Sequence, residues 1–400
     1  MTGNALMGTY QRQPVTFTHG HGPWVYDDAG NAYLDFLCGL AVTSLGHAHP
    51  AVTEAISEQA GRLVHVSNLF HTTPQQDLAR KLVQAAGWDD GRVFFGNSGA
   101  EAVEGALKLA RRHGKRTDPE KVHVVALDGG FHGRTMAALY ATGSPEKHAP
   151  FAPLGSWITH VPHDDPDALA AAVTDQTCAV ICEVVQGEGG VRPVPAEVLL
   201  AARQACDRAG ALLIADEIQT GLGRLGAWFG WQTTPVEPDV MAVAKALGNG
   251  LPIGAVIAHG AAANVFGLGD HGSTFGGGPV QAAAANAVMD TLTRENLVGR
   301  AAELGDALAV RLAGLSDRFA VVTGHRGRGL LQALTLAEPI AGAITQAALA
   351  NGLIVNAVAP DVLRIAPPVI IEPDHLDLMA ARLGAAIEQT QERGQHNETG

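Results

Sequence analysis

The chain has 400 residues, of which 46% are hydrophobic and 17% charged, and its 27 basic and 40 acidic side chains give a formal charge of −13. This is the balance of a globular protein long enough for two or three domains, and its scattered basic residues exclude nucleic acid and anionic membrane as expected partners. No uncharged apolar run reaches the roughly 20 residues of a membrane span. The opening MTGNALMGTY does not resemble a secretory signal, and the four cysteines form no C-x-x-C pair, so we expect a cytoplasmic protein.

The predicted elements begin with a hairpin in WVYDDAGNAYLDFLCG, where two aromatic-rich strands flank a turn signal at Asp28–Asn31. From about residue 90, short apolar strands alternate with helices. In chain order these are RVFF, SGAEAVEGALKLARRHG, VHVVAL, CAVICEVV, PAEVLLAARQACDRAG and ALLIADE. Continuously apolar strands that alternate with helices predict a mainly parallel sheet covered on both faces.

The alternation of strands and helices ends at about residue 290. RENLVGRAAELGDALAVRLAGL predicts one long helix, and GLLQALTL, GLIVNAV and VLRIAPP predict short strands of a smaller α+β domain. We therefore expect an α/β fold in three parts. Residues 1–60 contribute to the small domain, residues 61–290 form the large domain, and residues 291–400 form the C-terminal small domain.

The first candidate site is Ser98-Gly99-Ala100, where the strand RVFF gives way to a helix. The free N–H groups of a helix start and a hydroxyl suit a phosphate. The alternative is an ordinary Ser98 N-cap with Glu101 in the first turn, and this motif alone favours the cap.

The second candidate is Asp216, which ends the apolar strand ALLIA. Ligands of open α/β sheets bind beyond the carboxyl ends of the strands, so this carboxylate should face the crevice. A carboxylate there can keep a ring nitrogen protonated. Capping of the following loop is an equally open interpretation.

The third candidate is Lys245, the only basic side chain in the apolar stretch PDVMAVAKALGNGLPIGAVIA. We expect it on a helix, sharing a face with Met241, Ala242 and Gly248. It could be a snorkelling lysine at a helix end. Desolvation, however, lowers a lysine pKa and yields the neutral amine that condenses with an aldehyde, which is the environment of a Schiff-base lysine.

Two further patterns are weaker. Gly221–Gly226, GLGRLG, matches the dinucleotide fingerprint, but five residues separate it from the strand and aromatics follow it, so a plain loop is favoured over a dehydrogenase site. The histidine pairs His19/His21 and His47/His49 could chelate a metal, but no Cys/His array accompanies them, and no metal site is predicted.

A phosphate cradle, a strand-end carboxylate and a buried amine together match the needs of pyridoxal phosphate. The chain resembles the class III, fold-type I, pyridoxal-phosphate-dependent aminotransferases, and within them the acetylornithine/ornithine aminotransferases. The resemblance rests on YLDFLCGLAVTSLGHAHP, HVSNLF, FFGNSGAEA, KLARRHG, FHGRT, VVQGEGGV, IADEIQTGLGRLG, PDVMAVAKALGNGLPIGA, HGSTFGG and LRIAPP. It implies that residues 61–290 form the cofactor-binding domain.

The resemblance implies cofactor-binding roles for nine residues. Lys245 matches the Schiff-base lysine and Asp216 the partner of the ring nitrogen, and these two are the expected catalytic residues. The expected cofactor-binding residues are Ser98, Gly99, Ala100, Phe131, Asp216, Ile218, Gln219, Lys245 and Thr274. Phe131 and Ile218 would cover the two ring faces, and Gln219 would contact the phenolic oxygen. Thr274 would reach the phosphate from the neighbouring subunit, which implies a homodimer.

The resemblance also implies a reaction. Arg134, with Ser273 in the same pocket, would bind the carboxylate of an acetylornithine-type donor, Arg364 would bind the α-carboxylate of glutamate or 2-oxoglutarate, and Glu188 would neutralise Arg364 while the donor is bound. The expected function is transamination of N2-acetylornithine with 2-oxoglutarate in arginine biosynthesis. Ornithine, succinylornithine, 4-aminobutyrate and N-acyl-lysine donors remain open.

Four positions depart from the pattern that this family usually shows. They are Val103, Val184, Gly278 and Gln332. None of them replaces the lysine, the aspartate or an arginine, so they bear on the choice of substrate more than on the type of reaction.

Overall fold

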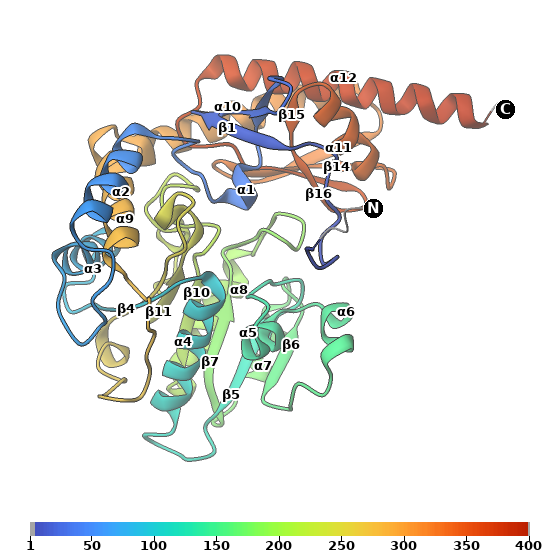
Figure 1. Ribbon diagram of the computed structural model, residues 1–400. Coiled ribbons are helices and arrows are strands. Elements are labelled where there is room, and N and C mark those ends of the chain that lie inside the picture. The colour runs from blue at the N-terminus through green and yellow to red at the C-terminus, as the bar shows by residue number, and fades with distance from the viewer. Residues whose placement is uncertain (1–4, 399–400) are drawn as a thin grey trace.

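The computed structural model describes residues 5–398, with side chains to residue 393. Its centre is a seven-stranded sheet in the order β4-β12-β11-β10-β7-β5-β6 (Figure 1). The strands are β4 (Arg92–Gly96), β5 (His123–Leu127), β6 (Ile158–Val161), β7 (Thr177–Cys182), β10 (Leu212–Asp216), β11 (Val240–Val243) and β12 (Gly254–Ala258). Only β12 is antiparallel to its neighbours. The predicted mainly parallel sheet is therefore confirmed.

Helices cover both faces of this sheet, as the apolar strands predict. Ile181 of β7 packs in one hydrophobic cluster with residues of α4 (Gly99–Gly114), whereas the adjacent Val180 packs in another cluster with residues of α8 (Ala196–Ala209). Successive side chains of a strand point to opposite faces, so a strand buried on both faces must be apolar throughout.

Two smaller sheets lie above the large one in Figure 1. The first is β1 (Phe17–His21), β2 (Trp24–Asp27), β3 (Ala32–Asp35) and β15 (Leu353–Ile354), and the second is β13 (Val322–Arg328), β14 (Leu331–Leu336), β17 (Val362–Ile365) and β16 (Asn356–Ala359). The predicted hairpin corresponds to β2 and β3. The pairing of β15 with β3 joins the N-terminal and C-terminal parts. The division at residues 60 and 290 stays a prediction, and its residues 1–4 and 399–400 lie outside the described residues.

The remaining elements complete the layers. They are α1 (Cys38–Ala41), α2 (Pro50–Arg62), α3 (Thr73–Ala86), α5 (Met136–Ala141), α6 (Pro145–His148), α7 (Pro166–Ala172), α9 (Pro279–Arg294), α10 (Leu297–Arg318), α11 (Ala341–Ala350), α12 (Pro373–Glu398), β8 (Val185–Gln186), β9 (Arg192–Pro193) and the 3-10 helices η1 (Ala149–Phe151), η2 (Gly230–Thr233), η3 (Lys245–Gly248) and η4 (Gly260–Ala262). Helices α2, α3 and α9 pack beside the large sheet, whereas α10, α11 and α12 cover the small sheets (Figure 1). No helix within residues 5–398 is long and apolar enough to cross a membrane.

Three local predictions are wrong. The expected helix around Lys245 is the end of β11 followed by the short η3, so Lys245 does not share a helical face with Met241. The long helix after residue 290 is broken at Asn296, whose φ of 49° lies in the left-handed region, and α10 begins at Leu297. The expected strand GLIVNAV is divided between β15 and β16, which belong to different sheets.

Gly221–Gly226 forms a loop around a buried arginine. Arg224 is 1% exposed; its guanidinium donates to the hydroxyl of Ser44 at 3.0 Å and to the carbonyls of Leu330, at 3.2 Å, and Pro367. These acceptors belong to segments far apart in sequence, so the loop ties the large sheet to both terminal parts of the chain. A structural loop, as the sequence favours, therefore replaces the dinucleotide interpretation.

Replacing Arg224 with methionine should lower the free energy of unfolding by about 3 kcal/mol, because buried acceptors left unpaired cost about 1–3 kcal/mol each. Urea denaturation followed by circular dichroism measures the change. Replacing the exposed Arg62 with methionine is the control, since its ion pair with Glu58 is on the surface. Equal stability of both variants would contradict the anchoring role.

Candidate active site

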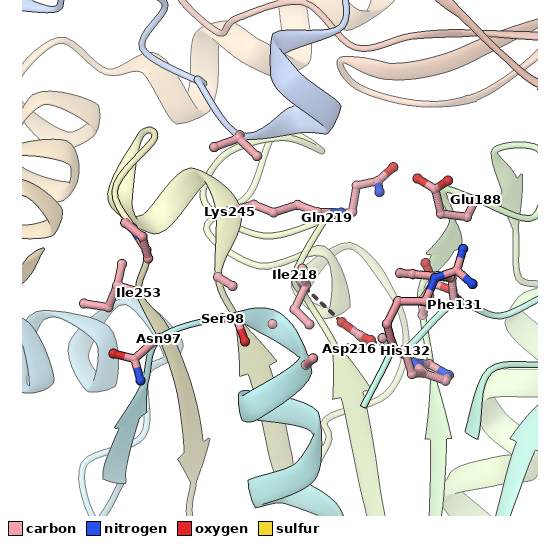
Figure 2. A pocket seen from close by; sticks show the side chains of 18 of the residues that line it. Asn97, Ser98, Phe131, His132, Glu188, Asp216, Ile218, Gln219, Lys245 and Ile253 are labelled. Carbon is pink, nitrogen blue, oxygen red and sulfur yellow. Dashed lines mark hydrogen bonds and ion pairs between the residues drawn. The ribbon is translucent and has the colours of Figure 1, made fainter. Parts of the chain in front are cut away.

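A pocket of about 400 Å³ opens above the carboxyl ends of β4, β10 and β11 (Figure 2). Ten of the predicted site residues line it. They are Ser98, Gly99, Ala100, Phe131, Arg134, Glu188, Asp216, Ile218, Gln219 and Lys245. The fold thus brings site residues predicted from separate segments, between Ser98 and Lys245, to one cavity.

Lys245 follows β11 and projects toward Gln219 across the pocket (Figure 2). Burial lowers its pKa below the usual lysine value, and Arg364 adds to this effect, although the charges of Glu188 and Asp216 oppose it. Its backbone φ is 44°, in the left-handed region that costs a residue other than glycine about 1–3 kcal/mol. Strain of this kind persists where the surrounding structure fixes it, and here it aims an amine into the cavity.

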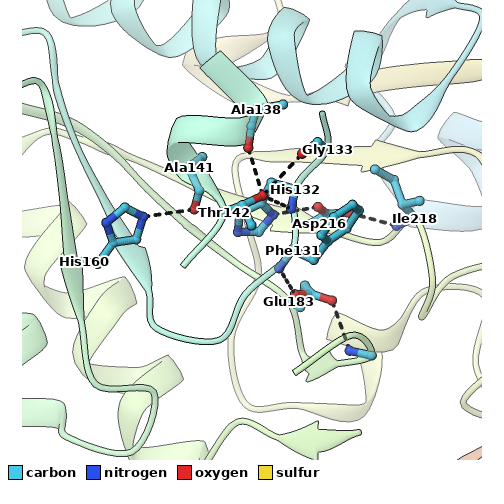
Figure 3. A network of polar contacts seen from close by, with 11 residues as sticks. Phe131, His132, Gly133, Ala138, Ala141, Thr142, His160, Glu183, Asp216 and Ile218 are labelled. Carbon is cyan, nitrogen blue, oxygen red and sulfur yellow. Dashed lines mark hydrogen bonds and ion pairs between the residues drawn. The ribbon is translucent and has the colours of Figure 1, made fainter. Parts of the chain in front are cut away.

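Asp216 ends β10 at 3% exposure. It accepts hydrogen bonds from the backbone N–H of Ile218 at 3.1 Å and from Nδ1 of His132 at 2.7 Å (Figure 3). Burial lowers the pKa of His132, but the hydrogen bond and charge of Asp216 outweigh it, so the pKa is raised. The contact with His132 therefore fixes the orientation of the Asp216 carboxylate, as a partner for a protonated ring nitrogen requires.

His132 and Glu183 also line the pocket, and the sequence reasoning did not include them among the site residues. The only signal for His132 was its place in FHGRT, next to Phe131. Glu183 is 5% exposed and accepts hydrogen bonds from the backbone N–H groups of Phe131, at 2.9 Å, and Gly187, at 3.2 Å (Figure 3). Glu183 therefore links the segment that carries Phe131 to the segment that carries Glu188. Burial raises the pKa of Glu183 to about 7, although His132 opposes the shift.

This raised pKa predicts a pH-dependent stability. Between about pH 4.5 and pH 7 the folded protein holds a proton on Glu183 that the unfolded chain has lost, so stability falls as the pH rises through this window. The cofactor-free wild type should lose on the order of 1–3 kcal/mol relative to Glu183→Gln across it. Urea unfolding at several pH values measures the difference between the two curves. The lost Gly187 hydrogen bond shifts the variant equally at every pH, so parallel curves would contradict the prediction.

The start of α4 meets the pocket at Ser98-Gly99-Ala100. The hydroxyl of Ser98 accepts from the backbone N–H of Glu101 at 3.2 Å, so the N-cap interpretation is confirmed. It is compatible with a phosphate site, because Gly99 and Ala100, the first residues of the helix, also line the cavity. A Cβ on Gly99 would lie 2.7 Å from Cδ1 of Ile218, so a larger residue here would displace the Ile218 side chain.

Arg364 reaches the wall of the pocket from β17. It is 1% exposed and forms an ion pair with Glu188, which lines the cavity, and it donates to Oε1 of Gln219 at 3.1 Å. Burial raises the pKa of Glu188, but the charge and hydrogen bond of Arg364 outweigh burial and lower it. Gln219 thus contacts Arg364 in this structure, and its expected contact with a ring oxygen stays a prediction.

Arg364 is not itself a lining residue, and two further predicted residues also lie outside the pocket. The hydroxyl of Ser273 accepts from Nδ2 of Asn97 at 3.0 Å, and Asn97, another residue not predicted, lines the cavity. Thr274 faces a separate depression beside Asn68. The histidine pairs form no metal group with other residues in the described chain; His47 instead pairs with Asp35 at 2.8 Å.

These residues fit pyridoxal phosphate. The N–H groups of α4 suit its phosphate, Asp216 its ring nitrogen, Lys245 its aldehyde, and Phe131 and Ile218 line the space between them (Figure 2). The model of the family described as aminotransferase class-III matches residues 7–387 of the chain.

The chain belongs to the class-III aminotransferases. It is therefore a pyridoxal-phosphate-dependent transaminase of fold type I, which uses an amino donor and a 2-oxoglutarate-type acceptor. The dehydrogenase alternative is excluded.

Its relatives include the acetylornithine aminotransferase of Streptomyces coelicolor, 46% identical over 97% of this chain and 94% of the relative. The acetylornithine aminotransferase of Mycolicibacterium smegmatis is 47% identical over 97% of both chains. Among solved structures, the ornithine aminotransferase of Toxoplasma gondii ME49 has a TM-score of 0.91 and 32% identity, covering 97% of this chain and 94% of that chain. The N-acetylornithine aminotransferase of Stenotrophomonas maltophilia has a TM-score of 0.83 and 33% identity, covering 96% and 98%.

Proposed function

We propose that this class-III aminotransferase transfers the terminal amino group of N2-acetylornithine to 2-oxoglutarate, giving N-acetylglutamate 5-semialdehyde and glutamate in arginine biosynthesis. The observation that carries the proposal is the unequal state of two arginines. Arg364 is paired with Glu188, whereas Arg134 stacks on Phe131 at 5.5 Å and has no ion pair with a described residue. The names of the curated relatives support the same substrate.

The two arginines suit two different substrates. A donor that presents its terminal amine to Lys245 carries its carboxylate at the far end of the molecule, where the exposed Arg134 can bind it. 2-Oxoglutarate must bring a carbon next to its α-carboxylate to the same place, and Arg364 then has to exchange Glu188 for that carboxylate. A charged guanidinium pairs well with planar carboxylates in either half-reaction.

When bound, pyridoxal phosphate supplies an aldehyde carbon and an electron-withdrawing ring. Lys245, whose pKa burial lowers, would accept the proton from the amine-bearing carbon of the donor and return it in the reverse direction. Asp216, whose carboxylate contacts Nδ1 of His132, would pair with the protonated ring nitrogen of the bound cofactor. Phe131 and Ile218 line the cavity, where they would cover the two faces of the ring.

A panel of amines tests the proposal. The purified holoenzyme should change its visible absorbance fastest, per molar concentration, with N2-acetylornithine in single-turnover mixing. Ornithine, N-succinylornithine, 4-aminobutyrate and N-acetyl-lysine are the comparison donors. A faster reaction with any of them would replace the substrate but keep the reaction type, whereas no reaction with any amine would contradict the function.

We also propose that the active site is completed in a homodimer by Thr274 of the neighbouring subunit. Thr274 lies outside the pocket of its own chain, and beside it Phe275 is 61% exposed. Leu69 and Phe70, at 86% and 64% exposure, line or adjoin the same depression, and exposed apolar clusters mark protein interfaces. Light scattering during size-exclusion chromatography should give twice the mass of the chain, and a monomer would contradict the proposal. The expected cytoplasmic location stays a prediction.

A further inference from the structure

Arg364 is a buried cation held between two strands. It lies in β17 with Asn356 of β16 directly opposite in the antiparallel register. Directly opposed residues of an antiparallel pair project from the same face of the sheet, with Cβ atoms about 5 Å apart. The amide oxygen of Asn356 therefore reaches the guanidinium, and it accepts a hydrogen bond from Nε of Arg364 at 3.2 Å.

The three guanidinium nitrogens of Arg364 have different surroundings. Nε donates to Asn356, and Nη1 donates to Glu188 and to Gln219. Nη2 is buried and has no hydrogen-bond partner among the described residues. A buried donor without an acceptor is destabilising, so Nη2 is a donor that a ligand carboxylate would satisfy.

Asn356 restricts the way in which a carboxylate can approach. A planar guanidinium binds a carboxylate bidentately along the edge formed by Nε and Nη2 or along the edge formed by Nη1 and Nη2. Because Nε is occupied, only the second edge remains, and Nη1 on that edge already contacts Glu188 at the pocket wall. Asn356 is uncharged, so it orients Arg364 without neutralising it.

We propose that Asn356 is a positioning residue for the second substrate. Its amide oxygen holds Nε of Arg364, so that the guanidinium keeps one orientation while Nη1 exchanges Glu188 for the α-carboxylate of 2-oxoglutarate or glutamate. This inference rests on the proposed function, in which Arg364 binds that carboxylate. Asn356 itself contacts neither the donor nor the reacting atoms.

The test separates binding of the second substrate from the rest of the reaction. Asn356→Leu keeps the size of the side chain and removes the acceptor. In the holoenzyme it should weaken binding of glutarate, an unreactive five-carbon dicarboxylate, by about tenfold in isothermal titration calorimetry, as expected for one hydrogen bond to a charged group. The half-reaction with glutamate should slow by a similar factor at low concentration. The half-reaction with N2-acetylornithine should stay within about twofold, because Arg364 is not its ligand.

Asn356→Asp is a second variant, nearly isosteric with the natural residue. It keeps an acceptor at Nε but adds a charge that competes for Arg364, so it too should weaken glutarate binding and spare the N2-acetylornithine half-reaction. Thr323→Val is the matched control, since it removes a hydroxyl contact with Thr335 in the same sheet, and it should change neither. Unchanged glutarate affinity in Asn356→Leu, or equal losses in both half-reactions, would overturn the inference.

Arg364→Lys separates a failure of the positioning role of Asn356 from a failure of the proposed function, in which Arg364 binds the carboxylate. If Arg364→Lys weakens glutarate binding and Asn356→Leu does not, the positioning role alone is wrong. If Arg364→Lys also leaves glutarate binding unchanged, Arg364 is not the carboxylate ligand, and the assignment of the second substrate fails together with the role of Asn356.

Discussion

Replacing Lys245 with alanine should lower the transamination rate by about 10⁴-fold or more, because the same amine serves as nucleophile and as proton carrier and general base catalysis alone contributes about 10²–10⁴-fold. Single-turnover absorbance changes with N2-acetylornithine measure the loss. Lys115→Ala is the control, since Lys115 is exposed at the end of α4 and should leave the rate unchanged.

Borohydride reduction gives a readout of Lys245 that does not depend on turnover. In the wild type it should fix the cofactor to the peptide that contains Lys245, as mass spectrometry can show. In Lys245→Ala no lysine should be labelled. Labelling of another lysine in the wild type would contradict the assignment even if the variant were inactive for another reason.

Asp216→Asn should reduce kcat by about 10²–10³-fold, comparable with the loss of one preorganised electrostatic contact in other active sites. The neutral amide cannot keep the ring nitrogen protonated, and it also removes the charge that raises the pKa of His132. Asp239→Asn is the matched control, because Asp239 lies at the opposite end of the sheet and pairs with Arg203.

The kcat of Asp216→Asn has to be compared with the amount of cofactor that the variant binds. The variant should retain the cofactor, because the α4 phosphate contacts remain, and its absorbance spectrum checks this. A kcat within about tenfold of the wild type, with cofactor bound, would show that Asp216 only caps the following loop, which is the interpretation that the sequence left open.

The sequence was informative where one segment contained both the residue and its environment. Lys245 lies in its own apolar stretch, and Asp216 ends its own strand, so each could be recognised locally. His132 could not, because its role depends on Asp216, which is 84 positions away and reached only through the fold. Asn356 is the same case, since its significance comes from the register between β16 and β17.

Local propensity also failed where tertiary structure decided the backbone. The apolar residues before Lys245 fit a helix as well as a buried strand, and a short apolar run does not distinguish the two. Pairing with β10 and β12 makes them a strand. The placement of Thr274 is a different problem, because a residue that acts in a neighbouring subunit has no signal in one chain beyond the resemblance.

The single reversed strand of the large sheet has a consequence for tolerance of insertions. Because β12 runs antiparallel beside β11, the connection between them stays at the end of the sheet where β11 stops. Lys245, Pro252 and Ile253 all line the pocket from this connection. Parallel neighbours would need a crossover of a dozen residues or more. The amine and this part of the pocket wall therefore belong to one connection with both ends fixed, so an inserted residue would displace them together, whereas surface loops generally tolerate insertions.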